Sequence, residues 1–218
     1  MLSRRELLKR AGLVGAAAVA TPIGTLVPPT SPAQSAAPVQ ATAAGSRIWE
    51  TLTAAQAEIL EAITARLIPS DANGPGALEA QAPRYIDRAL GGALASSLDA
   101  YRSGLEAIDN YARMWKGSLF AKLSAADQDA VLTDMEANVA VGFVPDASTF
   151  FNLVRAHTIQ GTFCDPYYGG NADFVGWDLI GYPGVRLAAT ANDQRLDSRL
   201  MPTHRSAYDY AMFSRKKP

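Results

Sequence analysis

Cysteine and histidine are scarce in this 218-residue sequence, which contains one cysteine, Cys164, and two histidines, His157 and His204. A single cysteine excludes an intramolecular disulfide, so packing must stabilise the fold. Patterns such as CxxC, CxxCH and HExxH are absent, and we expect no zinc, haem or iron–sulfur site built by this chain alone. GxGxxG after a strand, GxxxxGK[ST] and GxSxG are absent as well. We therefore expect no catalytic, metal-binding or cofactor-binding residue in this chain.

Charge of one sign does not dominate, since the sequence has 20 Lys and Arg against 21 Asp and Glu. Residues 1–45 hold four of the basic residues and one of the acidic ones, which leaves 16 and 20, or a net charge of about −4, for residues 46–218. This balance argues against a nucleic-acid partner. No apolar stretch has the length that a membrane-spanning helix needs.

The first residues form a recognisable export signal. Ser3 to Lys9, with Arg4 and Arg5 at its centre, match the twin-arginine pattern S-R-R-x-[F/L]-L-K, and a run rich in Ala, Gly and Val follows. A basic start before a short apolar core and small residues is a secretory layout. We predict that Arg4 and Arg5 direct the chain to the periplasm through the route for folded proteins. The open alternatives are an uncleaved N-terminal anchor and an ordinary basic helix start.

Two parts of the chain are expected from composition. Residues 21–45 are rich in Pro, Ala, Thr, Ser and Gln and predict a flexible linker, because they can bury little apolar surface. We therefore divide the chain into a signal and linker, 1–45, and one helical domain, 46–218. Several small-residue motifs fit signal cleavage, and the pattern does not choose among them.

Apolar residues at helical spacing predict an all-α fold. Thr53 and Gln56 form a capping-box pattern, and Ser124 opens a later helix in a similar way. The predicted helices run from Thr53 to before Pro69, over 83–90, over 94–115, from Ser124 through a stripe that ends at Val139, and over 147–162. After that the chain is dense in Gly, Pro and aromatic residues, which predicts a loop-rich C-terminal third without strands.

His157 and Cys164 allow two interpretations each. His157 lies among apolar positions of a predicted helix, as a hydrogen-bonded core or interface histidine or as a base or ligand. Cys164 fits a buried or interface thiol or a redox centre. Asp71 and Asp165 fit residues that brace turns or cap helices.

A resemblance to a known family rests on the segment after the last long helix. Residues 161–171, GTFCDPYYGGN, are followed by Gly176-Trp177 and by residues 181–184, GYPG. This series is similar to the G-x-F-x-D-P-x-Y-G-G-N … GW … GYPG signature of the gluconate 2-dehydrogenase subunit 3 family, the small or gamma subunits of periplasmic flavin dehydrogenases. The likeness extends over about residues 50–185, and no motif is recognised after Arg186.

The resemblance implies an accessory role. In such complexes a large subunit of the glucose–methanol–choline type carries FAD and oxidises a sugar, sugar acid or polyol, and a cytochrome c subunit with haem c often takes the electrons. The small subunit supplies the export signal for the twin-arginine machinery and helps the large one to mature. A periplasmic location follows, with membrane association through the complex. The alternatives are a stand-alone periplasmic binding or structural domain and an enzyme in its own right.

Residues of the C-terminal third are candidates for binding the large subunit, because Tyr and Trp dominate interface hot spots. The candidates are Phe163, Asp165, Tyr167, Tyr168, Asn171, Trp177 and Tyr182. The alternative is that the aromatic residues cover the domain's own small core. A late amphipathic segment around Arg205, Tyr208 and Phe213 fits either a segment that wraps the partner or a frayed end.

Overall fold

The computed structural model describes residues 48–197 and 200–213. Within these residues the chain forms six α-helices and no strand, which confirms the predicted all-α class. The helices are α2 (Ala54–Leu67), α3 (Ala82–Leu90), α4 (Leu98–Lys116), α5 (Ala125–Glu136), α6 (Ala147–Phe163) and α7 (Val175–Ile180). No helix in this part of the chain is long and apolar enough to cross a membrane. The predicted signal and linker, with Arg4 and Arg5, lie outside the described residues.

Side-chain caps begin three of the long helices. At α2 the Thr53 hydroxyl accepts a hydrogen bond from the Gln56 amide (3.3 Å), and the Gln56 side chain accepts one from the Thr53 amide (3.0 Å). Ser124 caps α5 and Asp146 caps α6 through the amide three residues on. Each cap satisfies a donor that the first helical turn leaves free, and so it sets where the helix starts.

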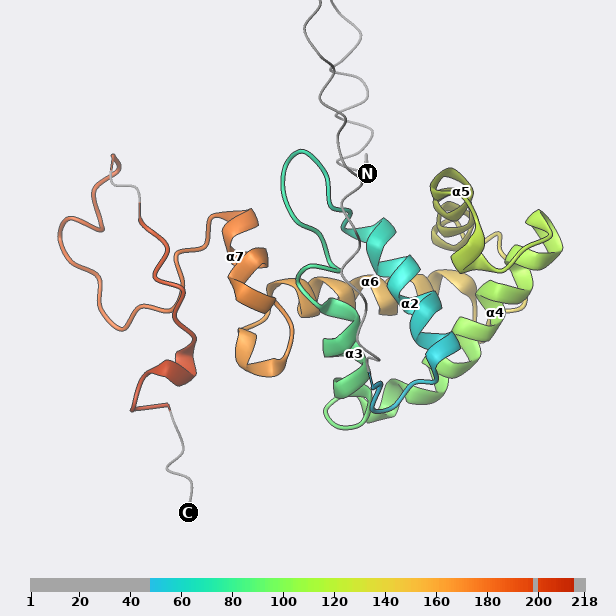
Figure 1. Ribbon diagram of the computed structural model, residues 1–218, viewed down its shortest axis with the longest axis horizontal. Coiled ribbons are helices and arrows are strands. Elements are labelled where there is room, and N and C mark those ends of the chain that lie inside the picture. Colours follow the sequence, from blue (N-terminus) through green and yellow to red (C-terminus); the bar gives the residue numbers. More distant parts are fainter. Residues whose placement is uncertain (1–47, 198–199, 214–218) are drawn as a thin grey trace, which may run out of the picture. The chain divides into compact units, whose positions relative to one another are not determined.

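The core lies where α6 packs against α3 and α5, with α2 and α4 around it (Figure 1). The predicted stripe Ile59, Leu60 and Ile63 of α2 is buried. Glycine allows the helices to approach closely. A Cβ on Gly104 of α4 would stand 2.4 Å from the ring of Phe150 in α6, and one on Gly161 would stand 2.9 Å from Tyr85 in α3. Tight packing of this kind leaves no room for even one methyl group.

Two predicted helix boundaries are wrong. The third helix starts at Leu98 rather than Leu94, because a turn and the 3₁₀ helix η1 (Ala95–Ser97) precede it. Helix α5 ends at Glu136, and Asn138 takes a left-handed conformation (φ 59°). The chain therefore leaves the helical path, and Val139 is 59% exposed instead of continuing the buried stripe.

The segment before α2 is tied to α3 by one buried carboxylate. Asp87, which is 3% exposed, accepts hydrogen bonds from the backbone amides of Glu50 (2.7 Å), Thr51 (3.0 Å) and Leu52 (2.8 Å). Three donors compensate for the cost of burying the charge. The start of the helical domain is thereby held against α3.

Candidate partner-binding surface

The segment that follows α6 folds around Asn171, whose accessible surface is zero. Its side-chain amide donates to the carbonyl of Cys164 (2.9 Å), and its side-chain oxygen accepts from the amides of Gly176 (2.8 Å) and Trp177 (3.3 Å). The residue itself is left-handed, with φ 45°, a conformation that Asn tolerates better than most residues. Asn171 therefore joins the end of α6 to the start of α7. It makes these contacts inside the domain.

Two glycines let this segment lie directly against the last turn of α6. A Cβ on Gly170 would stand 2.1 Å from the carbonyl oxygen of Gly161, and one on Gly176 would stand 1.9 Å from that of Thr162. Backbone atoms cannot move aside as a flexible side chain can. Glycine is therefore required at both positions by close approach.

Trp177 lies in the interior of the same segment. It is 5% exposed, and its indole N–H donates to the carbonyl of Phe163 (3.0 Å). Its ring contacts those of Phe174 (5.3 Å between centroids) and Tyr182 (4.8 Å, edge to face). Tyr182 is 40% exposed and covers Trp177. This part of the C-terminal third is a small aromatic core with Tyr182 at its surface.

Asp165 links the same segment to the C-terminal end of the described chain. One carboxylate oxygen accepts from the Tyr167 amide (3.0 Å) and the Ser206 hydroxyl (2.6 Å), and the other accepts from the Ala207 amide (2.9 Å). The predicted turn-bracing role of Asp165 is confirmed, as is that of Asp71, which accepts from the Asn73 amide (2.7 Å). The contact between Asp165 and Ser206 was not predicted, although the pattern Ser206-x-x-Asp209 is a capping signal.

Three tyrosines meet above Asp165, and we call Tyr167, Tyr168 and Tyr208 the tyrosine cluster. Tyr167 and Tyr208 stack with their ring centroids 3.6 Å apart, and the hydroxyls of Tyr168 and Tyr208 are 2.9 Å apart. Tyr167 is 60% exposed and Tyr168 is 50% exposed. These large rings are ordered by their neighbours but remain accessible to another molecule.

An apolar hollow of about 530 Å³ lies beside the tyrosine cluster, with Tyr168 in its wall. Ile159 and Phe163 of α6 line it, and Ile159 is 48% exposed. Cys164 also lines it, and burial raises the pKa of its thiol. The remaining lining residues are Tyr85, Ala93, Gln160 and Asp165. The hollow can receive an apolar side chain of another protein.

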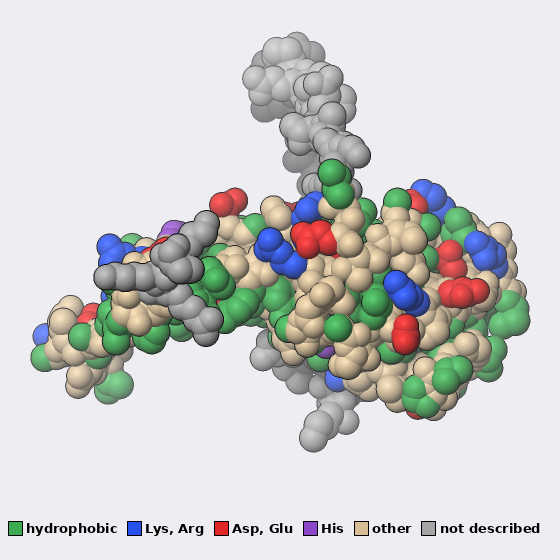
Figure 2. Space-filling view, turned by 90° about the horizontal axis from the view of Figure 1, so that it is seen from below, with side chains coloured by type: hydrophobic (Ala, Val, Ile, Leu, Met, Phe, Trp, Pro, Cys, Tyr) green, Lys and Arg blue, Asp and Glu red, His purple; other side chains and the backbone are tan. Residues whose placement is uncertain are grey.

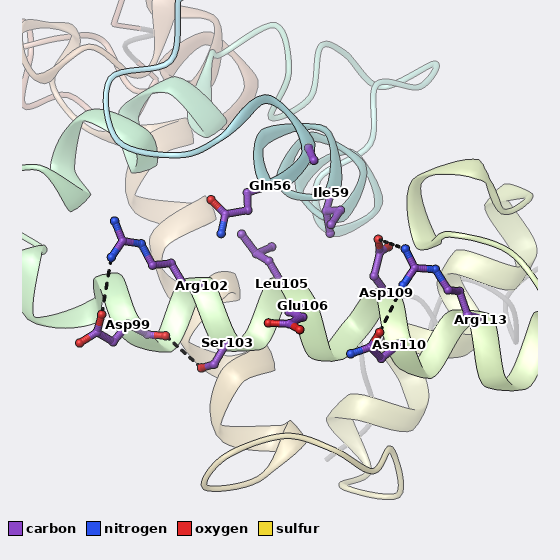
Figure 3. A pocket seen from close by; sticks show the side chains of 11 residues that line it. Gln56, Ile59, Asp99, Arg102, Ser103, Leu105, Glu106, Asp109, Asn110 and Arg113 are labelled. Atoms are coloured by element: carbon purple, nitrogen blue, oxygen red, sulfur yellow. Dashed lines mark hydrogen bonds and ion pairs between the residues drawn. The ribbon is translucent and has the colours of Figure 1, made fainter.

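A second hollow, of about 590 Å³, lies between the start of α2 and α4 and is mainly polar (Figure 3). Arg102 lies 3.9 Å from Asp99, and Arg113 lies 3.8 Å from Asp109 and donates to Asn110 (3.3 Å). Its α4 wall carries both negative groups (Asp99, Glu106 and Asp109) and positive ones (Arg102 and Arg113), as the sticks in Figure 3 show. Because acidic and basic side chains both line this hollow, it does not select for a ligand of one charge sign.

His157 of α6 is buried in the domain, in agreement with its interpretation as a hydrogen-bonded core histidine. It is 6% exposed, its Nδ1 lies 3.1 Å from the hydroxyl of Tyr101, and the two rings stack with centroids 5.8 Å apart. Burial lowers the pKa of the imidazole and raises that of the Tyr101 hydroxyl. Across residues 48–197 and 200–213, no group of three His, Cys, Asp or Glu side chains is placed to hold a metal ion.

Charged side chains of both signs are interspersed over the helices on the face shown in Figure 2, with hydrophobic side chains between them. Of the seven interface candidates, Tyr167, Tyr168 and Tyr182 are exposed, and Phe163 and Asp165 are partly buried. Asn171 and Trp177 are buried. The structure thus brings the candidates together in one segment but divides them into an outer and an inner group.

Comparison with known proteins gives one match. The family model described as Gluconate 2-dehydrogenase subunit 3 matches residues 54–184, from the first residue of α2 to the glycine that ends the GYPG sequence. Searches of curated proteins and of solved structures found no significant match.

Proposed function

Because the chain belongs to the gluconate 2-dehydrogenase subunit 3 family, we propose that it is the accessory small subunit of a periplasmic FAD-dependent dehydrogenase. In this proposal a flavoprotein large subunit of the glucose–methanol–choline type holds FAD and oxidises a sugar, sugar acid or polyol. This chain binds that subunit, stabilises it and supplies its export signal. A cytochrome c subunit is a further partner.

The observation that carries the proposal is the family match, which covers all six described helices and the whole segment around Asn171. The exposed tyrosines support it, since Tyr side chains bury a large area at small entropic cost and are frequent at the centres of interfaces. The apolar hollow beside them offers a place for an anchoring side chain of the partner.

The sequence at the N-terminus supports the export part of the proposal. Arg4 and Arg5 stand within a twin-arginine pattern, and this route carries proteins that have folded before they cross the membrane. A flavoprotein that must bind FAD before export requires such a route. A single signal on the small subunit would then serve both chains.

Co-expression with the large subunit tests the proposal. In a variant with Arg4→Lys and Arg5→Lys together, we expect the flavoprotein and its dehydrogenase activity to remain in the cytoplasm, because the receptor requires the arginine pair. Arg10→Lys, a change of the same type outside the pair, is the matched control and should leave export intact. Equal delivery of the large subunit with the double variant would refute the escort role, and failure of the purified chains to associate would favour a stand-alone domain.

A further inference from the structure

One carboxylate organises two separate turns of the chain. The 3₁₀ helix η3 (Pro166–Tyr168) follows Asp165 directly, whereas η5 (Ala207–Asp209) lies about forty residues later. Asp165 accepts hydrogen bonds from both, through the Tyr167 amide on one side and through Ser206 and Ala207 on the other. Charge-assisted hydrogen bonds are stronger than neutral ones. The position of η5 relative to η3 is therefore set by Asp165.

The two turns carry the tyrosine cluster. Tyr167 and Tyr168 come from η3, and Tyr208 comes from η5. The stack of Tyr167 on Tyr208 and the edge-to-face contacts of Tyr168 with both rings hold the three side chains in one arrangement. A partner that binds this arrangement does not have to order the rings first, which removes part of the entropic cost of association.

The tyrosines of the cluster come from two separate parts of the sequence. The family match ends at Gly184, so Tyr167 and Tyr168 lie inside the matched region and Tyr208 lies outside it. Residues beyond the match return to it through the Thr203 amide, which donates to the Pro183 carbonyl (2.8 Å), and through the bonds of Ser206 and Ala207 to Asp165. The segment that follows the matched region thus packs its Tyr208 against Tyr167 and Tyr168 of that region.

The surroundings of the cluster indicate what kind of surface would fit it. The centre of the cluster presents no unpaired charge, because the Asp165 carboxylate accepts hydrogen bonds from two backbone amides and one hydroxyl. The apolar hollow adjoins the cluster at Tyr168. Two exposed cations stand at its edge. The Arg88 guanidinium lies 3.0 Å from where a Cβ on Gly169 would stand and 3.8 Å from the Glu50 carboxylate, in an exposed ion pair. Arg205 directly precedes the capping residue of η5, and its guanidinium lies 5.7 Å from the centre of the Tyr210 ring. The nearby Asp209 carboxylate accepts a hydrogen bond from the Ser206 amide (2.8 Å).

We propose that the tyrosine cluster, completed by the C-terminal segment and positioned by Asp165, is the docking surface for the flavoprotein large subunit. The partner patch that complements it has apolar side chains at its centre, one of them entering the hollow, and carboxylates at the edge facing Arg88 and Arg205. This inference rests on the proposed function. It assigns Tyr208, which lies beyond the matched region, as a contact with the large subunit.

The experiment measures the dissociation constant of the full chain and its variants with the purified large subunit. We expect Tyr208→Ala to weaken binding at least tenfold while the melting temperature of the small subunit changes little. Trp115→Ala is the matched control, because Trp115 is an aromatic residue on α4 that is 47% exposed and lies outside the proposed surface. It should change the dissociation constant less than twofold.

Asp165 is tested as a positioning residue by a double-variant cycle. Asp165→Asn should weaken binding because it loosens η5. If Asp165 acts by positioning Tyr208, the double variant Asp165→Asn with Tyr208→Ala should bind about as weakly as the more weakly binding of the two single variants, so its loss of binding free energy should be smaller than the sum of the two single losses. Trypsin should cleave after Arg205 faster in Asp165→Asn. A general structural role for Asp165 would instead produce additive losses.

Charge at the edge is tested by Arg205→Glu, which should weaken binding and reduce its dependence on salt. If Tyr208→Ala binds the large subunit as tightly as the wild type, or if Trp115→Ala weakens binding as much as Tyr208→Ala does, the proposed docking surface is wrong. Binding by the wild-type chain would in either case still support the proposed function. Absence of binding by the wild-type chain would overturn the proposed function itself.

Discussion

The helical body and the C-terminal third are held together by different means. In the body, α2 to α6 and the turns between them bury apolar and aromatic side chains against one another, including Leu60, Tyr101 and Phe120 with no accessible surface. In residues 164–197 and 200–213 few side chains are buried, and the chain is held together by hydrogen bonds of Asp165 and Asn171 and by ring contacts. The first kind of stability is spread over many contacts, and the second depends on a few residues.

This difference has a consequence for mutation. Loss of one apolar side chain from the body removes only a part of the total stabilisation by buried surface, and neighbouring side chains can partly fill the cavity. Loss of a hydrogen-bonding hub leaves several backbone donors and acceptors unpaired together. We therefore expect substitutions in the C-terminal third to release that third locally, and substitutions in the body to destabilise the whole domain.

The largest effect is expected from Gly176→Ala. The new methyl group would meet the Thr162 carbonyl oxygen at 1.9 Å, and because this atom belongs to the backbone of α6, α7 must separate from it. A loss of about 4 kcal/mol is reasonable for such a clash. Urea denaturation followed by near-ultraviolet circular dichroism measures it. Gly92→Ala is the control, since its nearest atom lies 4.0 Å away, and an equal loss there would contradict the steric explanation.

A comparable but global effect is expected from Leu60→Ala in α2. Leu60 has no accessible surface, and truncation of a buried leucine typically costs about 3 kcal/mol through lost burial and a cavity. Thermal unfolding should remain one transition at a lower midpoint. Hydrogen exchange should then accelerate in α3 and α6 as well as in α2. If only α2 loses protection, the body does not unfold as one unit.

Asn171→Ala tests the opposite region. It removes three hydrogen bonds and leaves the Gly176 and Trp177 amides without their partner, which we expect to cost about 2 kcal/mol. Hydrogen exchange should accelerate over residues 164–182 while α2 and α4 keep their protection. Ser148→Ala, which removes a partly buried hydroxyl that donates one hydrogen bond to Asp146 (2.8 Å) at the start of α6, is a mild control. Equal loss of protection in the body would remove the distinction between the two regions.

The smallest effect is a pH dependence that arises in the body. Burial lowers the pKa of His157, whereas in the unfolded chain a histidine titrates near 6.5. Below about pH 6.5 the unfolded state therefore binds more protons than the folded state, and stability falls as the pH falls. Denaturation at pH 7 and pH 5 should show a smaller difference in His157→Gln than in the wild type. An equal difference would mean that His157 does not contribute.

Much of the fold could be predicted from local patterns. The capping pair Thr53 and Gln56 and the stripe of Ile59, Leu60 and Ile63 located α2, because caps and apolar periodicity act within a few residues. The end of α5 was missed, since the turn at Asn138 overrides an apolar residue at Val139 that continues the helical spacing. Helix α7 was missed because its start depends on bonds to Asn171 rather than on a local cap.

The candidate surface was predicted as a segment but not as an arrangement. Aromatic composition indicated Tyr167, Tyr168 and Tyr182, and composition alone did not separate these exposed residues from the buried Trp177. The contact of Asp165 with Ser206 joins positions 41 residues apart. A contact of that separation leaves no periodic signal in the sequence.

Composition, caps and spacing were sufficient for the all-α class and for the starts of α2, α5 and α6, and the resemblance of residues 161–184 to a known signature indicated the family, because each of these signals lies in residues that are close together in the chain. Whether an aromatic or polar residue of the C-terminal third faces inward or outward followed from long-range contacts. Tyr208 joined the surface because folding brought its ring against that of Tyr167, and Asn171 became an internal link because its segment folds back onto the last turn of α6. Those distances are properties of the packed domain rather than of any local stretch of sequence.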